Sequence, residues 1–436
     1  MLNFVKSHIC TVRFSRNALI LLLVVSHCIA PLERNELKSH FEELDPNGLN
    51  FRITNELSEF SGSKFIEKEA KDFLQQWNLV GMTMAVVKGG KLVYAHGFGY
   101  SDLETKQSVE PGNLFRVASV SKLITAVAIM KLVEKKAFSL DSKVFGPKAI
   151  LKDPVFNSVA DKRMYFITVR QLLAHTGGWS LHYGDPAFNS LIVAEQTGEK
   201  SATMDTYCRF VASRKLHFDP GTRSCYSNMG YMFLRKVVET ASGQSYEKFV
   251  REQVLKPAGI TDMHIGQSYL SGRRFNEVKY YESEESQPVP CFDGSGRLVP
   301  KQYGGNPIEL LSSAGGWITS SIELAKLMVM IDGFNTVPDM IPHSLINQMV
   351  EEDELRGPLG WKIVKDGDWI RTGSMAGTSA IVKRQSNGFC WVVIFNTSSW
   401  KGPRLPAYTD FMMRKIEQKI TNWPQKDLFK YTPKKL

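Results

Sequence analysis

Apolar side chains dominate one long segment in the first third of the chain. Between residues 119 and 133 they wrap almost the whole circumference of a predicted helix, so this helix is expected to be buried on most faces. A second, amphipathic helix is predicted at 64–77, and the chain from 119 to about 256 is predicted to be mostly helical. The apolar positions of the first helix are Val120, Leu123, Ile124, Ala126, Val127, Ile129, Met130, Leu132 and Val133.

Strand patterns occur on either side of this helical region. The runs 82–87 and 92–96, joined by the turn Lys88-Gly89-Gly90-Lys91, predict a β-hairpin. A meander is predicted late in the chain, and a helix at 405–420 follows it. Its strands are predicted at 358–364, 368–372, 378–383 and 389–396, with turns at Asp366-Gly367 and Asn387-Gly388.

The early hairpin is expected to join the late meander in one antiparallel sheet between helices. The predicted fold class is therefore α/β, of the α+β type, with the helical region 119–256 inserted as a subdomain. A chain of 436 residues that is 43% hydrophobic can bury one large core and a subsidiary helical region. The segment 282–301, rich in Ser, Glu, Pro and Gly, is expected to be the longest loop.

Two short motifs carry the candidate chemistry. Ser119 and Lys122 are three residues apart at the start of the buried helix, so their side chains project from one face. The only Tyr-x-Asn sequence, Tyr226-Ser227-Asn228, lies well downstream. Together these residue types suit a serine hydrolase that activates its nucleophile with lysine and tyrosine instead of histidine.

Either Lys122 or Tyr226 could be the base. A lysine side chain has a pKa of about 10.4 in water, and burial in the apolar helix would lower it towards neutrality. The phenol of Tyr226 has a pKa of about 10 in water, and a neighbouring ammonium group would stabilise its ionised form. The sequence leaves these alternatives open.

The Ser-x-x-Lys pattern alone is a weak signal, because it also occurs at 61–64, 245–248 and 398–401. Ser119 differs in its context, since the hairpin and a connecting loop lead into an apolar helix. Its place at a helix N-terminus would favour an oxyanion there. The alternative is that Ser119 is only a helix N-cap.

A basic residue followed by Thr-Gly is the third expected element. Arg371-Thr372-Gly373 closes a predicted strand after Tyr226, where Arg371 could bind a carboxylate and the Ser374 N–H could complete an oxyanion hole with the Ser119 N–H. The alternative for Arg371 is a solvated charge at the sheet edge. His175-Thr176-Gly177 also fits the pattern, but it is interpreted as a helix-ending loop.

With these motifs in order, the chain resembles the class C beta-lactamase and D-alanyl-D-alanine carboxypeptidase family, including its animal beta-lactamase-like members. The resemblance extends over roughly 65–420. It implies Ser119 as the acylated nucleophile, Lys122 and Tyr226 as proton handlers, and Asn228 as a ligand for the substrate amide. Three further segments carry it: Ile167–Gly178, Pro220-Gly221-Thr222, and Ala314-Gly315-Gly316-Trp317 leading into Ser321–Ala325.

Arg371 departs from the resemblance, because the family has lysine or histidine before Thr-Gly. Arginine keeps its charge and its donors, but it cannot release a proton. The glutamate-bearing loop of class A enzymes has no obvious counterpart, which favours tyrosine-assisted deacylation. Two functions are therefore expected: a hydrolase acting on amides, peptides or esters, or a non-catalytic, assembly-forming protein that kept the fold.

Composition suggests no cofactor, and no Cys/His spacing typical of a metal site occurs. The formal charge of +10 is concentrated at the two ends of the chain, and no nucleic-acid recognition motif accompanies it. The expected partner is a small molecule or short peptide. A basic C-terminal tail, 421–436, could touch anionic lipid or another subunit through its aromatic residues, and a solvated end is the alternative.

Residues 1–30 are predicted to be a targeting segment, which leaves 31–420 as the catalytic domain. The segment has three basic residues, no acidic residue, and an apolar stretch at 18–25 that is too short to span a bilayer. A secretory signal is the preferred interpretation, and it would make the protein extracellular. A mitochondrial presequence is the alternative.

Overall fold

The computed structural model describes residues 48–353 and 355–433. The predicted targeting segment, 1–30, lies outside the described residues, as do 434–436. Within the described part of the chain, no helix combines the length and the apolar character needed to span a bilayer.

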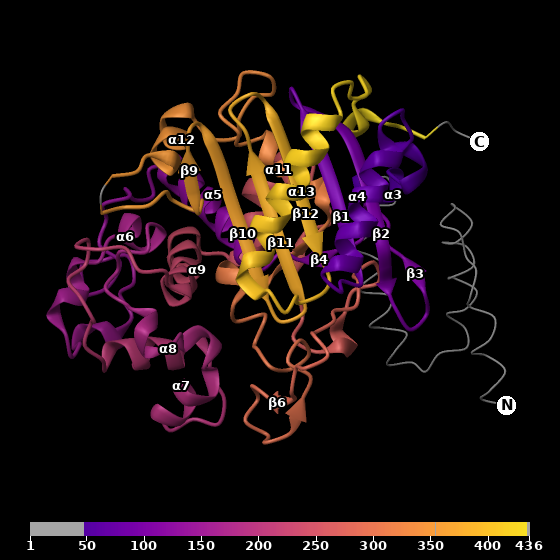
Figure 1. Ribbon diagram of the computed structural model, residues 1–436. Helices are drawn as coiled ribbons and strands as arrows, with labels where there is room; N and C mark the ends of the chain where they lie inside the picture. The colour runs from indigo at the N-terminus through magenta and orange to yellow at the C-terminus, as the bar shows by residue number, and fades with distance from the viewer. Residues whose placement is uncertain (1–47, 354, 434–436) are drawn as a thin grey trace, which may run out of the picture.

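A seven-stranded sheet forms the centre of the molecule (Figure 1), in the order β3-β2-β1-β12-β11-β10-β9. β1 (Gly81–Lys88) pairs antiparallel with β12 (Phe389–Phe395), with Met82 opposite Phe395. The early hairpin therefore joins the late meander, as predicted. The other strands of this sheet are β2 (Lys91–Asp102), β3 (Gln107–Ser108), β9 (Ile363–Lys365), β10 (Asp368–Met375) and β11 (Thr378–Arg384).

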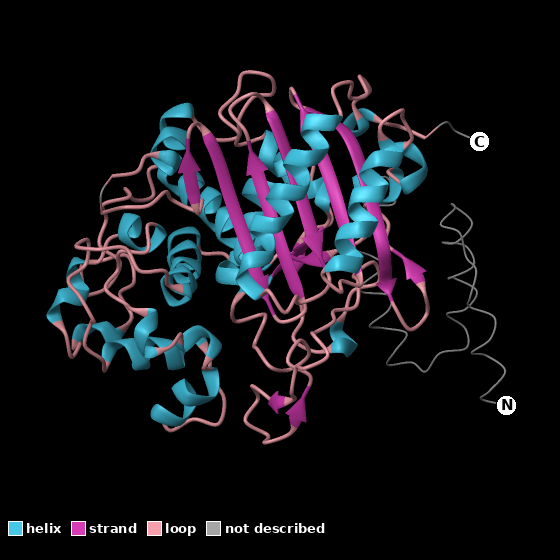
Figure 2. Cartoon of the chain, in the orientation of Figure 1, coloured by secondary structure: helices cyan, strands magenta, loops and turns pink. Residues whose placement is uncertain are grey.

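Helices cover the sheet on both faces (Figure 2), which explains why β12 is apolar along its whole length and β1 is buried as far as Val87. Because strand side chains alternate, Met84 points into one core and Ala85 into the other. The first core is closed by α4 (Ser63–Gln76) and α13 (Leu405–Lys419), and the second by α5 (Ser121–Glu134) and α11 (Ser321–Val329). The predicted helices at 64–77 and 405–420 are thus confirmed.

The helical region lies beside one end of the sheet (Figure 1). The prediction of a mostly helical middle is confirmed in kind, although short helices and irregular segments replace long helices between α5 and α8. The helices of this region are α6 (Val169–Leu173), α7 (Ser190–Gln196), α8 (Met204–Ala212), α9 (Asn228–Ser242) and α10 (Tyr246–Val250). Two helices elsewhere are α3 (Leu49–Arg52) and α12 (His343–Val350).

Two small sheets complete the described fold. One is three-stranded, with β8 (Trp317–Thr319) between β4 (Phe115–Arg116) and β5 (His264–Ile265). The other pairs β6 (Val289–Pro290) with β7 (Leu298–Val299). This second pair lies inside the predicted long loop 282–301, so that loop is folded back on itself as a short hairpin.

The first late strand is shorter than predicted, because β9 begins only at Ile363. Before it, the Leu359 N–H donates to the Met349 carbonyl at 2.8 Å, and Gly360 has a φ of +84°. A Cβ at Gly360 would lie 2.5 Å from the Cβ of Ala126 in α5. The chain at Gly360 therefore packs on α5, and hydrogen bonding to β10 starts only at Lys362, whose N–H donates to the Ile370 carbonyl at 2.9 Å.

The C-terminal segment is part of the fold. Trp423 and Phe429 are 6% and 8% exposed, and each belongs to one of the two cores. Asp427 accepts a hydrogen bond from the Leu92 N–H of β2 at 3.2 Å. Trp423 and Phe429 therefore fill space against the sheet, and a contact of the basic tail with anionic lipid or another subunit stays a prediction.

Candidate active site

Ser119 lies in a single 3-10 turn, η3 (Ala118–Val120), which leads directly into α5. Ala118 has a φ of +45°, a left-handed conformation that is costly for a residue with a Cβ. The N-cap alternative is wrong, because the N-cap position of α5 is Val120 and no side-chain cap bond is made there in the described structure. The strained turn instead presents Ser119 to two partners.

These partners are Lys122 and Tyr226, the two residues that the sequence motifs predicted beside Ser119. The Lys122 Nζ donates to the Ser119 Oγ at 3.2 Å, and the Tyr226 hydroxyl donates to the same oxygen at 2.7 Å. The serine hydroxyl thus accepts from an amine of α5, the helix that follows its turn, and from a phenol more than 100 residues away. This arrangement can take a proton from Ser119 by either route.

Lys122 is completely buried, and each of its three N–H groups has an acceptor. Besides Ser119, the acceptors are the Asn228 Oδ1 at 2.6 Å and the Ala314 carbonyl. Burial lowers the pKa of Lys122 to about 8, and the Arg371 charge adds to that effect, whereas Tyr226 opposes it. The amine can therefore lose its proton near neutral pH.

The pKa of Tyr226 is lowered to about 8 as well, although its burial acts in the opposite direction. The positive charges of Lys122 and Arg371, together with the polar contacts of the phenol with Lys122 and Ser119, outweigh that burial. Because both pKa values are lowered to about 8, although burial acts on them in opposite directions, a proton can pass between the two groups at little cost. The structure keeps both alternatives for the base open.

Arg371 lies beneath the site, in β10. Its side chain is 1% exposed, so the alternative of a solvated edge charge is wrong. Its Nε donates to the Ser119 carbonyl at 2.8 Å, its Nη1 to the Trp361 carbonyl at 3.3 Å, and its Nη2 to the Tyr226 hydroxyl at 3.3 Å. This geometry does not favour the predicted binding of a substrate carboxylate by Arg371, because each guanidinium nitrogen already donates a hydrogen bond to the protein.

Gly373 fits the close approach of β10 to the Ser119 turn. A Cβ there would lie 2.2 Å from the Val117 carbonyl oxygen and 2.9 Å from the Ser119 nitrogen. The strand therefore runs directly against the Ser119 amide, with Ser374 next along it. The oxyanion hole from the Ser119 and Ser374 N–H groups stays a prediction.

Thr372, the remaining residue of this motif, is bonded to a lysine that sequence reasoning missed. The Nζ of Lys362 donates to the Thr372 Oγ1 at 3.1 Å, and the Lys362 side chain is exposed. Although the residue as a whole is exposed, partial burial lowers the pKa of Lys362, and the charge of Arg371 adds to this effect. Lys362 precedes a strand without any motif of its own, so its place beside the site could not be found from sequence.

Asn228 is the first residue of α9, a helix capped by the Ser227 side chain through the Gly230 N–H at 3.1 Å. Its carbonyl oxygen accepts from Lys122, and its amide nitrogen donates to the carboxylate of Asp185. Both ends of the amide are thus engaged within the protein, whereas the sequence predicted a contact with the substrate amide. Sequence reasoning missed Asp185, which resembles an ordinary cap because it caps η7 (Pro186–Phe188).

His175 contacts the tyrosine motif through a hydrogen bond and a ring contact. Its Nδ1 accepts from the Ser227 N–H at 3.1 Å, and its ring centroid lies 4.5 Å from that of Tyr226. Burial, together with the charges of Arg371 and Lys122, holds its pKa well below the usual value, so the ring is neutral. The interpretation as a structural loop residue agrees with this geometry, although its contact with Tyr226 was not foreseen.

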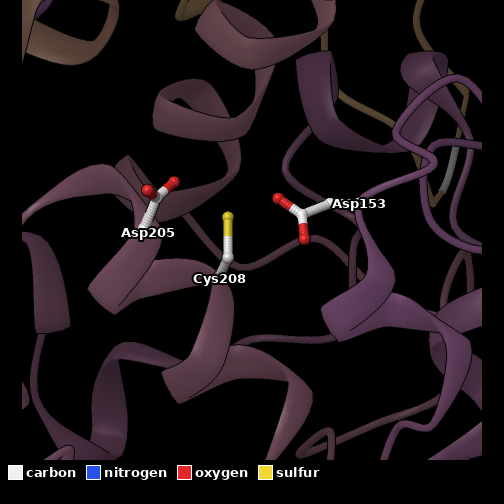
Figure 3. A group of neighbouring side chains, drawn as sticks. All are labelled: Asp153, Asp205 and Cys208. Carbon is white, nitrogen blue, oxygen red and sulfur yellow. The ribbon is translucent and has the colours of Figure 1, made fainter.

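A second cluster of chemically capable side chains lies in the helical region (Figure 3). Asp153, Asp205 and Cys208 place one ligand atom each within 4.8 Å of one another. The Nζ of Lys236 lies 3.7 Å from the Asp153 carboxylate and 3.5 Å from the Asp205 carboxylate. Burial raises the pKa of Cys208 to about 11, so its thiol stays protonated. Because Lys236 already supplies a positive charge, we assign no metal to this cluster.

The fold and these motifs define a serine hydrolase type of architecture, with a Ser-x-x-Lys turn beside a Tyr-x-Asn helix and an antiparallel sheet. The sequence model of the Beta-lactamase family matches residues 66–410, so the chain belongs to the beta-lactamase family. This match lies within the predicted domain 31–420.

Known relatives extend this assignment. Protein flp of Staphylococcus aureus (strain N315) is 28% identical over 238 residues, which are 55% of this chain and 44% of the relative. The match thus spans less than half of the relative's length. Solved structures that share the fold include the following two. The octameric penicillin-binding protein homologue from Pyrococcus abyssi has a TM-score of 0.59 and 23% identity, covering 82% of this chain and 79% of its own. The D-amino acid amidase from Ochrobactrum anthropi SV3, complexed with L-phenylalanine amide, has a TM-score of 0.63 and 17% identity, covering 82% and 98%.

Proposed function

We propose that this protein is a serine hydrolase that forms an acyl-enzyme on Ser119 with amide, peptide or ester substrates. The observation that carries the proposal is the pair of hydrogen bonds to the Ser119 Oγ, from the Lys122 amine and the Tyr226 phenol. A buried amine and a phenol with pKa values of about 8 are matched to proton transfer near neutral pH.

In the acylation step, the Ser119 Oγ attacks the substrate carbonyl carbon while its proton passes to Lys122 or Tyr226. The tetrahedral intermediate then expels the amine or alcohol, which takes that proton from the same pair. In deacylation, water attacks the ester carbonyl and gives a proton to the pair, which returns a proton to the Ser119 oxygen. Arg371 stays charged and stabilises the phenolate form of Tyr226 throughout.

The substrate class follows from what the site offers. Arg371 is committed to the Ser119 turn, so a substrate carboxylate would have to meet the exposed Lys362 at the Thr372 side of the site. Amidase, penicillin-binding and carboxypeptidase activities among similar proteins support small amides and short peptides as substrates.

The test is covalent labelling of the purified protein with a fluorophosphonate probe and with a fluorescent beta-lactam. We expect labelling of the wild type by the fluorophosphonate, and none of the Ser119→Ala variant. Ser245→Ala is the matched control, because Ser245 belongs to another Ser-x-x-Lys sequence and is exposed. Unchanged labelling of Ser119→Ala would overturn the assignment of the nucleophile. A wild type that neither probe labels would favour the non-catalytic, assembly-forming alternative.

A further inference from the structure

A cavity of about 220 Å³ opens next to the candidate active site. Tyr226 forms part of its wall, so the cavity lies directly beside the phenol that contacts Ser119. Aromatic side chains line much of the rest, including Trp179, Tyr183 and Phe210. Its size suits one amino-acid side chain or a similar small group.

Asp185 places a carboxylate in the wall of this cavity. One carboxylate oxygen accepts from the Ala187 N–H at 3.1 Å, and the other accepts from the Asn228 amide. Among the described residues, no lysine, arginine or histidine forms an ion pair with it within 4.0 Å. Burial raises the pKa of Asp185, whereas the two hydrogen bonds and the positive charge of Lys122, on the other side of Asn228, oppose this rise. A carboxylate that is partly desolvated and has no directly paired cation gains stability from an incoming ammonium group.

We propose that this cavity binds the acyl portion of the substrate and that Asp185 recognises a protonated amine there. The preferred substrates are then amides or esters of amino acids with a free amino group. This inference rests on the proposed function, because it assigns the substrate class of the same site. The aromatic residues Trp179 and Tyr183 in the cavity wall supply π-systems that are compatible with a cation.

Basic side chains also line the cavity, but they lie where solvent screens them. Arg214, Lys215 and His217 are exposed, whereas Asp185 is half-buried. The guanidinium of Arg214 donates to the Gln196 Oε1 at 2.7 Å and stacks over Phe210 at 5.4 Å from the ring centroid. Among the charged residues in the cavity wall, the carboxylate of Asp185 is therefore the most buried, and the buried cations Lys122 and Arg371 lie outside that wall.

Asp185 has a competing role that the experiment must separate. By accepting from the Asn228 nitrogen, it turns the Asn228 oxygen towards Lys122. A residue that only positions Asn228 would affect all substrates equally. Asp185→Asn keeps an oxygen that can accept from the Asn228 amide but removes the charge, so it tests amine recognition selectively.

The experiment measures ligand binding by calorimetry to the Ser119→Ala protein, in which turnover is blocked. The probes are phenylalanine amide, with its free amine, and N-acetylphenylalanine amide, in both enantiomers. We expect at least one enantiomer of the free amine to bind about tenfold or more tightly than its acetylated counterpart. Asp185→Asn should remove about tenfold to a hundredfold of that affinity and leave the acetylated ligand unchanged. Asp219→Asn is the matched control, since Asp219 is an exposed carboxylate paired with Arg163 at 2.6 Å.

Equal binding of the amine and its acetylated form would overturn the inference, as would no measurable binding of either. An equal loss for both ligands in Asp185→Asn would leave Asp185 as a positioning residue for Asn228 and also overturn it. Failure of the proposed function is a separate outcome, because it is a wild type that the fluorophosphonate probe does not label. If a protein that the probe does not label still bound the free amine selectively, the assigned ligand class of the cavity would stand and the proposed hydrolysis would not.

Discussion

At the scale of single residues, the site depends on an amine and a phenol whose proton affinities converge. Burial lowers the pKa of Lys122 below the usual lysine value. Two adjacent cations lower the pKa of Tyr226 in spite of its burial. Sequence could identify this pair because helix geometry links Ser119 to Lys122 over three residues. It could not find Asp185, whose partner Asn228 is 43 residues away along irregular chain.

The pH dependence of acylation follows from these pKa values. Both groups have lowered pKa values, so the base form accumulates above about pH 8 and is lost as the pH falls. We expect the rate of fluorophosphonate labelling of Ser119 to rise with pH through a single limb with an apparent pKa of about 8. The labelling rate is measured from samples quenched at successive times in buffers from about pH 6 to about pH 10. A rate that is flat over this range contradicts the lowered pKa values.

Lys122→Arg should slow labelling by about a hundredfold to ten-thousandfold, because a permanently charged guanidinium cannot accept the serine proton. Lys131→Arg, on the same helix α5, is the control and should label normally, since Lys131 bonds to Glu134 and the Met340 carbonyl away from Ser119. The melting temperature of each variant separates lost chemistry from lost folding. Full activity of a folded Lys122→Arg protein would leave Tyr226 as the sole base.

At the scale of elements, one helix end positions the whole tyrosine motif. Tyr226 precedes the N-cap Ser227, and Asn228 is the first residue of α9, so the capping bond fixes the direction of both side chains. The N–H of Ser227 is in turn held by the ring of His175. The sequence predicted the motif and the apolar helices. It could not predict the contact between His175 and Ser227, because this contact joins two loops whose paths depend on tertiary packing.

Removing this cap tests the arrangement. Ser227→Ala should lower the free energy of unfolding by about 1 kcal/mol and also slow labelling of Ser119, because the start of α9 loosens. The control is Thr203→Ala, which removes the capping box of α8. It should cost a similar free energy and leave the labelling rate unchanged. Urea unfolding and labelling rates, measured on the same preparations, decide the matter. Similar labelling rates in the two variants would show that the cap has no role in the site.

At the scale of the whole molecule, the sheet separates two cores, and the candidate site belongs to one of them. The early hairpin and the late meander were predictable because their apolar runs and Gly turns are local signals. The packing of 421–433 was not, since the basic side chains of this segment conceal that Trp423 and Phe429 fill gaps in the two cores. The shortened β9 has the same origin, because the contact of Gly360 with α5 overrides its strand pattern.

This separation predicts that the two cores differ in their effect on chemistry. Leu123 in α5 and Met413 in α13 are both completely buried, but on opposite faces of the sheet. Either residue changed to alanine should lower the free energy of unfolding by about 2 to 5 kcal/mol, because each change leaves a cavity.

Only Leu123→Ala should also slow labelling of Ser119 at a temperature where both variants stay folded, since Leu123 adjoins Lys122 in the helix that carries it. Met413 lies in α13, which the sheet separates from the Ser119 turn. Calorimetric melting and labelling kinetics of the two variants therefore show whether a cavity in one core affects the rate at which Ser119 is labelled. If Met413→Ala slowed labelling as much as Leu123→Ala, the two cores would respond as one unit, and the sheet would transmit strain to the site instead of insulating it.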